Sequence, residues 1–86
     1  MRAGTIVARN IRRLRAARGQ SQEGLAGDAG LHATYVNRLE NQRQNATVPV
    51  LEKLAQALGC DIRDLFDPAK VAKPVRPLRG GRRKGR

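Results

Sequence analysis

The sequence predicts an all-α fold of five helices followed by a disordered basic C-terminal tail. Apolar residues recur at the three- and four-residue spacing of a helix face between residues 5 and 66. No segment shows the alternation of apolar and polar residues that is typical of a strand. A chain of 86 residues suits one small domain. We therefore expect one ordered domain at residues 1–67 and the tail at residues 68–86.

The first helix is predicted at about residues 5–18, and Gly19 ends it because glycine accepts the left-handed backbone found at helix ends. The second is predicted at about residues 22–29, with Ser21 as its N-cap and Gly30 as its breaker. The apolar faces of these two helices carry Val7, Ile11, Leu14, Leu25, Ala26 and Ala29.

A third helix is predicted at about residues 33–41. Thr47 caps a fourth, which carries Pro49 in its first turn and stops at Gly59. Asp61 caps a short fifth helix. The apolar faces of these three helices carry Val36, Leu39, Leu51, Leu54, Ala55, Leu58, Ile62, Leu65 and Phe66.

The charge is strongly positive and unevenly distributed. The net charge is +11; residues 1–67 hold 10 basic and 7 acidic residues, whereas residues 68–86 hold 8 basic residues and no acid. A chain of this charge associates with polyanions, and nucleic acid is the first candidate. The tail has too few apolar residues to bury the surface that would offset the entropy cost of ordering, so we expect it to be disordered.

Several classes of protein are excluded by composition. The single cysteine, Cys60, leaves no intrachain disulfide, and the single histidine makes a metal site improbable, so no metal or cofactor is expected. No apolar run is long enough to cross a membrane and no signal peptide is visible, so we expect a cytoplasmic protein. No catalytic set of side chains is present, so an enzyme is not expected.

The segment from residue 21 to residue 41 predicts a helix-turn-helix. Gly30 allows a steep crossing between two helices joined by a short turn, and Ala26 lets those helices approach closely. The segment resembles the helix-turn-helix of the Cro/lambda-repressor-like (XRE-type) family. The matching residues are Gln22, Leu25, Ala26, Ala29, Gly30, Leu31, Val36, Leu39 and Glu40. The stretch "TYVNRLENQRQNATV" is also similar to the restriction–modification controller proteins of that family.

The resemblance implies a compact five-helix lambda-repressor-like domain that reads double-stranded DNA with its third helix in the major groove. The positions that it assigns to base edges are His32, Ala33, Thr34, Asn37 and Arg38. The positions that it assigns to the DNA backbone are Gln22, Tyr35, Arg43, Gln44 and Asn45. Tyr35 either contacts a phosphate or covers the edge of the core, and His32 either contacts DNA or leaves an exposed ring at the helix start. The resemblance also implies an ion pair between Arg15 and Glu40 that joins the first helix to the end of the third.

Gly24 and Gly27 depart from the family pattern. Members usually carry Glu at the position of Gly24, where it completes a capping box with Ser21. Each interior glycine costs roughly 0.5–1 kcal/mol relative to alanine. We therefore expect the second helix to fray, and Gly24→Glu to raise the melting temperature.

Family members usually bind an inverted repeat as dimers. A homodimer is therefore expected here, with Val48, Leu65 and Phe66 as its candidate surface and core packing as the open alternative for each. A second function stays open, because small proteins of this family also serve as antitoxins that bind a protein partner and repress their own promoter.

Overall fold

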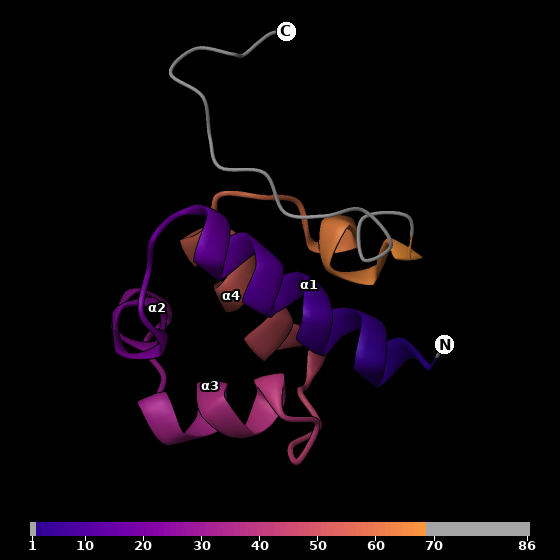
Figure 1. The fold of residues 1–86 in the computed structure, drawn as a ribbon, viewed down its shortest axis with the longest axis horizontal. Coiled ribbons are helices and arrows are strands. Elements are labelled where there is room, and N and C mark those ends of the chain that lie inside the picture. Colours follow the sequence, from indigo (N-terminus) through magenta and orange to yellow (C-terminus); the bar gives the residue numbers. More distant parts are fainter. Residues whose placement is uncertain (1, 69–86) are drawn as a thin grey trace, which may run out of the picture.

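The computed structural model describes residues 2–68, and within that range it contains helices and no strand. The elements are α1 (Ala3–Ala17), α2 (Gln22–Ala29), α3 (Ala33–Glu40), α4 (Val48–Leu58) and a 3₁₀ helix, η1 (Ile62–Phe66) (Figure 1). The predicted all-α fold is confirmed. The expected fifth helix is a 3₁₀ segment of five residues, and α1 begins at Ala3 rather than near residue 5. The tail expected after Pro68 lies outside the described residues.

α2, α4 and η1 begin at residues whose side chains cap them, whereas α1 and α3 have no side-chain cap. Ser21 Oγ accepts the backbone N–H of Gly24 at 2.8 Å, and Thr47 Oγ1 accepts that of Val50 at 3.4 Å. Asp61 accepts the N–H of Arg63 at 3.1 Å, and Asp64 reaches back to the N–H of Asp61 at the same distance. The second helix therefore starts where the sequence predicts, and η1 is closed by a reciprocal capping box.

The core lies where α1 crosses α4, with α2 and α3 to one side and η1 to the other (Figure 1). Its fully buried side chains are Ile11, Leu25, Val36, Leu54 and Leu65. Leu65 has no exposed surface, so it belongs to the core and not to a dimer surface. Val48 and Phe66, by contrast, are 62% and 41% exposed. The choice between core packing and a dimer surface is thus decided for Leu65 and stays open for Val48 and Phe66.

One polar side chain is fully buried in this core. Asn10 of α1 has no exposed surface, and its Nδ2 donates to the carbonyl oxygens of Leu65 at 3.0 Å and Asp67 at 3.2 Å. Buried carbonyl groups need such partners, because leaving one unpaired costs about 1–3 kcal/mol. Asn10 therefore anchors η1 on α1, although its own Oδ1 has no partner within the described part of the chain.

The two glycines near the end of α2 should respond in opposite ways to alanine. A Cβ on Gly27 meets no atom within 4 Å, whereas Gly30 has φ of 71°, where a side chain is strained. We expect Gly27→Ala to raise the free energy of unfolding by about 0.5–1 kcal/mol. We expect Gly30→Ala to lower it by about 1–2 kcal/mol. Urea unfolding measures both, and a Gly27→Ala variant less stable than the parent would contradict this view of α2.

The rise in melting temperature expected for Gly24→Glu is smaller than helix propensity and the capping box alone suggest. A Cβ on Gly24 lies 3.2 Å from Ser21 Oγ, so the capping hydroxyl must shift by a few tenths of an ångström. Gly27 is therefore the cleaner test of how much the interior glycines destabilise α2.

Candidate nucleic-acid interface

The helix-turn-helix is built around the end of α2. Gly30 adopts the left-handed conformation, and the N–H of Leu31 donates to the carbonyl oxygen of Ala26 at 2.8 Å. Ala26 is only 2% exposed, and α2 packs against both α3 and α4. The tight turn and the small side chain together let α3 cross α2 closely. As a result, α3 lies along the lower edge of the molecule in Figure 1.

The buried and exposed sides of α3 are clearly separated. Val36 and Leu39 lie in the core, whereas Thr34, Asn37 and Arg38 are exposed. Ala33 is half-buried against the core, so this position is less open than the sequence suggests. His32 precedes α3 with an exposed ring and makes no capping hydrogen bond. Of the five predicted base-edge positions, the structure thus exposes His32, Thr34, Asn37 and Arg38.

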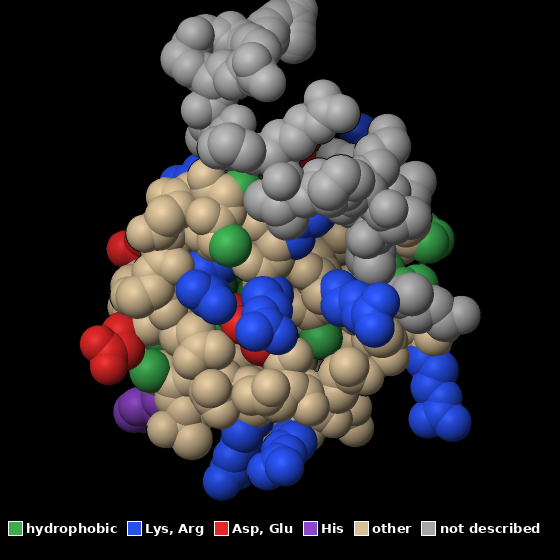
Figure 2. Space-filling view, in the orientation of Figure 1, with side chains coloured by type: hydrophobic (Ala, Val, Ile, Leu, Met, Phe, Trp, Pro, Cys, Tyr) green, Lys and Arg blue, Asp and Glu red, His purple; other side chains and the backbone are tan. Residues whose placement is uncertain are grey.

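Positive charge is available beside this exposed face. Arg38 and Arg43 are both exposed, and the N–H of Arg43 donates to the carbonyl oxygen of Arg38 at 2.8 Å. In residues 2–68 the ion pairs are Arg15–Glu40 and Arg63–Asp61, so neither Arg38 nor Arg43 is neutralised. Figure 2 shows Lys and Arg side chains at the lower edge of the molecule, where α3 lies, and others across the middle of the view, over α1. The face that carries α3 therefore favours a polyanion.

The loop after α3 is held by the helix itself. Tyr35 is half-buried against the core, and its hydroxyl donates to the carbonyl oxygen of Asn45 at 3.4 Å. Gln44 Nε2 donates to the same oxygen at 3.4 Å. Tyr35 thus covers the core edge and also keeps a hydroxyl at the surface. Arg43, Gln44 and Asn45 follow one another between α3 and α4, as the resemblance implies for a backbone-contacting loop.

An ion pair joins α1 to the end of α3. Arg15 Nε lies 2.7 Å from Glu40 Oε2, and Arg15 Nη2 donates to Glu40 Oε1 at 3.0 Å. The side chain of Glu40 is 3% exposed and that of Arg15 is 17% exposed. The hydrogen bond to Glu40 raises the pKa of the Arg15 guanidinium above its usual value; burial opposes this rise and the charge of Glu40 adds to it. The two parallel hydrogen bonds form a bidentate contact, which fixes the orientation of both the Arg15 and the Glu40 side chains.

Gln22 extends this ion pair to the exposed side of α3. Its Nε2 donates to Glu40 Oε1 at 3.1 Å, and its Oε1 accepts the Nδ2 of Asn37 at 3.1 Å. The side chain of Gln22 therefore links a buried carboxylate to an exposed amide that lies about one turn earlier on the same helix. Gln22 also begins α2, where unpaired backbone N–H groups favour anions.

The sequence patterns did not identify three residues that the structure adds as candidates: Thr5, Asn41 and Gln42. Asn41 Nδ2 donates to the carbonyl oxygen of Asn37 at 2.9 Å and lies 3.4 Å from its Oδ1. Thr5 donates to Gln42 Oε1 at 2.7 Å, and Gln42 has φ of 61°, which is uncommon for a residue other than glycine. The polar run after α3 was a weak signal for Asn41 and Gln42; nothing local pointed to Thr5.

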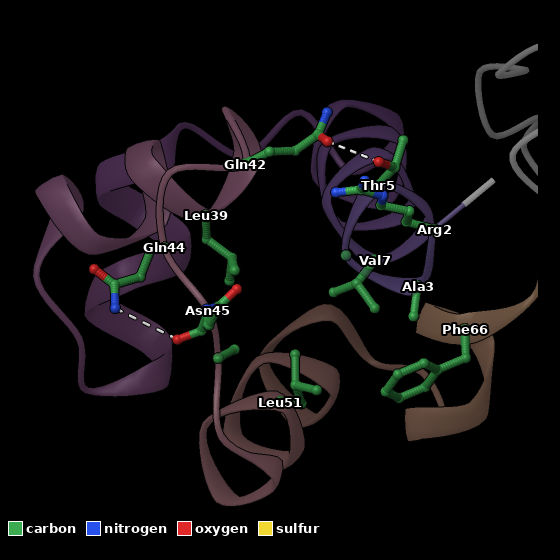
Figure 3. A pocket seen from close by; sticks show the side chains of 12 residues that line it. Arg2, Ala3, Thr5, Val7, Leu39, Gln42, Gln44, Asn45, Leu51 and Phe66 are labelled. Carbon is green, nitrogen blue, oxygen red and sulfur yellow. Dashed lines mark hydrogen bonds between the residues drawn. The ribbon is translucent and has the colours of Figure 1, made fainter.

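The Thr5–Gln42 hydrogen bond lies at a cleft of about 390 Å³ between the start of α1, the loop after α3 and η1 (Figure 3). Apolar side chains such as Val7, Leu39 and Phe66 form part of its wall, and no acid, histidine or cysteine lines it. Within residues 2–68, no three potential metal ligands come together. In the same range, no helix has the length and hydropathy needed to span a bilayer.

Comparison with known proteins agrees with this architecture. A helix-turn-helix domain model matches residues 6–69. A hypothetical transcription factor of Neisseria meningitidis is 41% identical over 63 residues, which is 73% of this chain and 59% of that protein. The control protein C.SmaI of Serratia marcescens is 40% identical over 61 residues, covering 71% of this chain and 73% of C.SmaI.

The solved structures show the same likeness. The restriction–modification controller protein C.AhdI from Aeromonas hydrophila superimposes with a TM-score of 0.71 at 38% identity, covering 73% of this chain and 96% of C.AhdI. The chain therefore belongs to the XRE-type helix-turn-helix family of DNA-binding transcription regulators.

Proposed function

We propose that the chain is a sequence-specific regulator of transcription that binds double-stranded DNA with α3 in the major groove. The observation that carries this proposal is the exposed row of Thr34, Asn37 and Arg38 on a helix whose other side is fixed in the core. The major groove of B-DNA is about 12 Å wide and admits one α-helix. The adjacent unneutralised guanidinium groups of Arg38 and Arg43 supply the matching charge.

Each exposed side chain suits a particular base edge. Arg38 bonds a guanine through its two-pronged guanidinium, and Asn37 bonds an adenine through its amide. Thr34 contacts a thymine methyl group, and the half-buried Ala33 offers a methyl contact only where the groove comes closest. His32 lies at the end of α3 that enters the groove and contacts a base or a phosphate.

The DNA backbone is held from both ends of the motif. Gln22 donates to a phosphate oxygen on one side of the groove, and the Tyr35 hydroxyl, which lies beside Asn45, turns to a phosphate oxygen on the other side. Arg43, Gln44 and Asn45 grip the other side from the loop before α4. Contacts of this kind set affinity and register but carry little sequence information.

We further propose that the chain binds as a homodimer, because one short recognition helix spans few base pairs and a dimer doubles the site. Val48 and Phe66 are the large apolar side chains that the described part of the chain leaves exposed. We expect the Val48→Glu/Phe66→Glu double variant to sediment as a monomer with unchanged helix content. The exposed Ala16 of α1 gives a control, since Ala16→Glu should leave the dimer intact. A parent protein that is monomeric on its DNA site would contradict this proposal.

The test of function is selection of bound duplexes from a random pool. The proposal predicts an inverted repeat whose half-sites lie about one helical turn apart, roughly 10 base pairs centre to centre. A pool that shows no enriched sequence after several rounds would contradict sequence-specific binding.

The eight basic residues after Pro68 add a separate electrostatic prediction that rests on sequence alone. Deleting residues 68–86 should weaken binding to all duplexes similarly and flatten the salt dependence of the affinity, because fewer phosphate counterions are released. Titrations at several salt concentrations measure the slope. A deletion that changed which sequence is preferred would show that the tail reads bases.

A further inference from the structure

A continuous chain of polar side chains runs from α1 to the exposed side of α3. Arg15 donates two hydrogen bonds to Glu40, Gln22 donates to Glu40 at 3.1 Å, and Asn37 donates to Gln22 at 3.1 Å. Asn41 then donates to Asn37, at 2.9 Å to its carbonyl oxygen and at 3.4 Å to its Oδ1. This series of hydrogen bonds connects the nearly buried carboxylate of Glu40 to the side chain of Asn37, which faces solvent.

The directions of the hydrogen bonds that link Glu40, Gln22 and Asn37 follow from the carboxylate. An ionised carboxylate only accepts hydrogen bonds, so Gln22 must turn its Nε2 toward Glu40. The Oε1 of Gln22 then lies at the other end of its amide, where it can only accept. Asn37 must therefore present its Nδ2 to Gln22. An isolated amide has two orientations of nearly equal shape, and here the charge of Glu40 selects one of them.

The same orientation leaves Asn37 with a defined pattern toward solvent. One N–H of Nδ2 is used by Gln22 and the second is free, while Oδ1 keeps an acceptor site beside Asn41. A free donor next to an acceptor with a remaining lone pair complements the N7 and the N6 amino group of adenine in the major groove. A reversed amide would exchange the two, and adenine in the same place would meet an acceptor with its own acceptor.

We infer that the Arg15–Glu40 ion pair, acting through Gln22, sets the amide orientation of Asn37 and thereby the base that Asn37 prefers. This inference rests on the proposed function. It makes Glu40 and Gln22 positioning residues for base choice, in addition to the phosphate contact expected of Gln22. It also separates two effects, because a lost phosphate contact weakens all sequences alike whereas a lost orientation changes preference at one position.

The experiment uses Gln22→Met in the full chain, with Gln56→Met as its matched control on the exposed side of α4. Base preference is measured by selection from a random duplex pool, and the base pair read by Asn37 is the one whose preference Asn37→Ala abolishes. In Gln22→Met the preference at that base pair should fall by about tenfold, with other positions unchanged. Adding Gln22→Met to Asn37→Ala should cause no further loss there.

A second readout needs no DNA. In NMR spectra of the free protein, the side-chain amide protons of Asn37 should shift in Gln22→Met and stay in place in Gln56→Met. The source of the polarity is tested by the Arg15→Met/Glu40→Gln double variant, which leaves no unpaired charge and lets Gln22 take either orientation. That variant should broaden the preference at the same base pair.

The outcomes are distinct. Uniform weakening of all sequences by Gln22→Met, with the preference at the Asn37 position intact, would show a phosphate contact alone and overturn the inference. Unchanged preference in the folded Arg15→Met/Glu40→Gln variant would overturn the role of the carboxylate. A parent chain with no preference at any position would overturn the proposed function as well, and unshifted Asn37 amide protons would overturn the inference independently of it.

Discussion

The Arg15→Met variant should lose about 3–5 kcal/mol of unfolding free energy, because it leaves a nearly buried carboxylate without its partner. The side chain of Glu40 is 3% exposed, and Gln22 then supplies one neutral hydrogen bond in place of a charged fork. Methionine keeps most of the aliphatic packing of arginine, so the loss reports the charge rather than a cavity. Urea unfolding followed by circular dichroism measures it.

Arg12→Met is the matched control, since Arg12 is exposed on the same helix. It should change the unfolding free energy by less than about 0.5 kcal/mol. An Arg15→Met variant as stable as Arg12→Met would contradict the structural role of the pair.

The stabilisation by the Arg15–Glu40 ion pair should not change with pH through titration of Arg15, except at very high pH. Its folded-state pKa is raised, so the stabilisation is fully present below the unfolded-state pKa of arginine and is lost only as pH rises through the folded-state value. Titration of Arg15 therefore leaves the ion pair intact at every pH below the arginine range.

The second large effect is expected at Arg38. Arg38→Ala should weaken binding to the selected duplex by about tenfold or more, because a two-pronged contact to guanine carries about 1–3 kcal/mol of discrimination. Binding to unrelated duplexes should weaken far less, since it depends on total charge. Fluorescence anisotropy at one fixed salt concentration compares the two duplexes.

Arg9→Ala removes the same charge from the exposed face of α1 and serves as the control. It should weaken both duplexes by a similar, small factor. If Arg38→Ala behaved in the same way, Arg38 would be a backbone contact and the placement of α3 would need revision.

Local chemistry explains why much of the fold was predictable. Ser21, Thr47 and Gly30 act on backbone groups within a few residues of themselves, so their effects can be inferred without knowing the rest of the molecule. The type of η1 could not be inferred. A segment of five residues with apolar spacing of three and four fits one turn of either an α-helix or a 3₁₀ helix.

Long-range pairing explains what the sequence did not reveal. Asn10 bonds carbonyl groups 55 and 57 residues away, and an asparagine among apolar residues gives no indication of such partners. The burial of Leu65 was open for a similar reason, because an apolar residue near the end of a domain packs equally well on its own core or on a second copy.

The candidate site divides in the same way. Val36 and Leu39 define the inward side of α3, and the family resemblance assigned Asn37 and Arg38 to its outward side. The half-burial of Ala33 and the hydrogen bond between Gln22 and Asn37 depend on the angle between α2 and α3, which Gly30 permits but does not specify. The hydrogen bond from Asn41 to Asn37 depends on the side-chain conformation at the end of α3, which the sequence does not specify.

The most direct measurement compares two duplexes in one competition assay: the sequence selected from the random pool and a scrambled duplex of equal length and composition. With α3 reading base edges, the protein should prefer the selected duplex by at least about a thousandfold at physiological salt. Equal affinity for the two duplexes would contradict the proposal that the exposed side of α3 reads sequence.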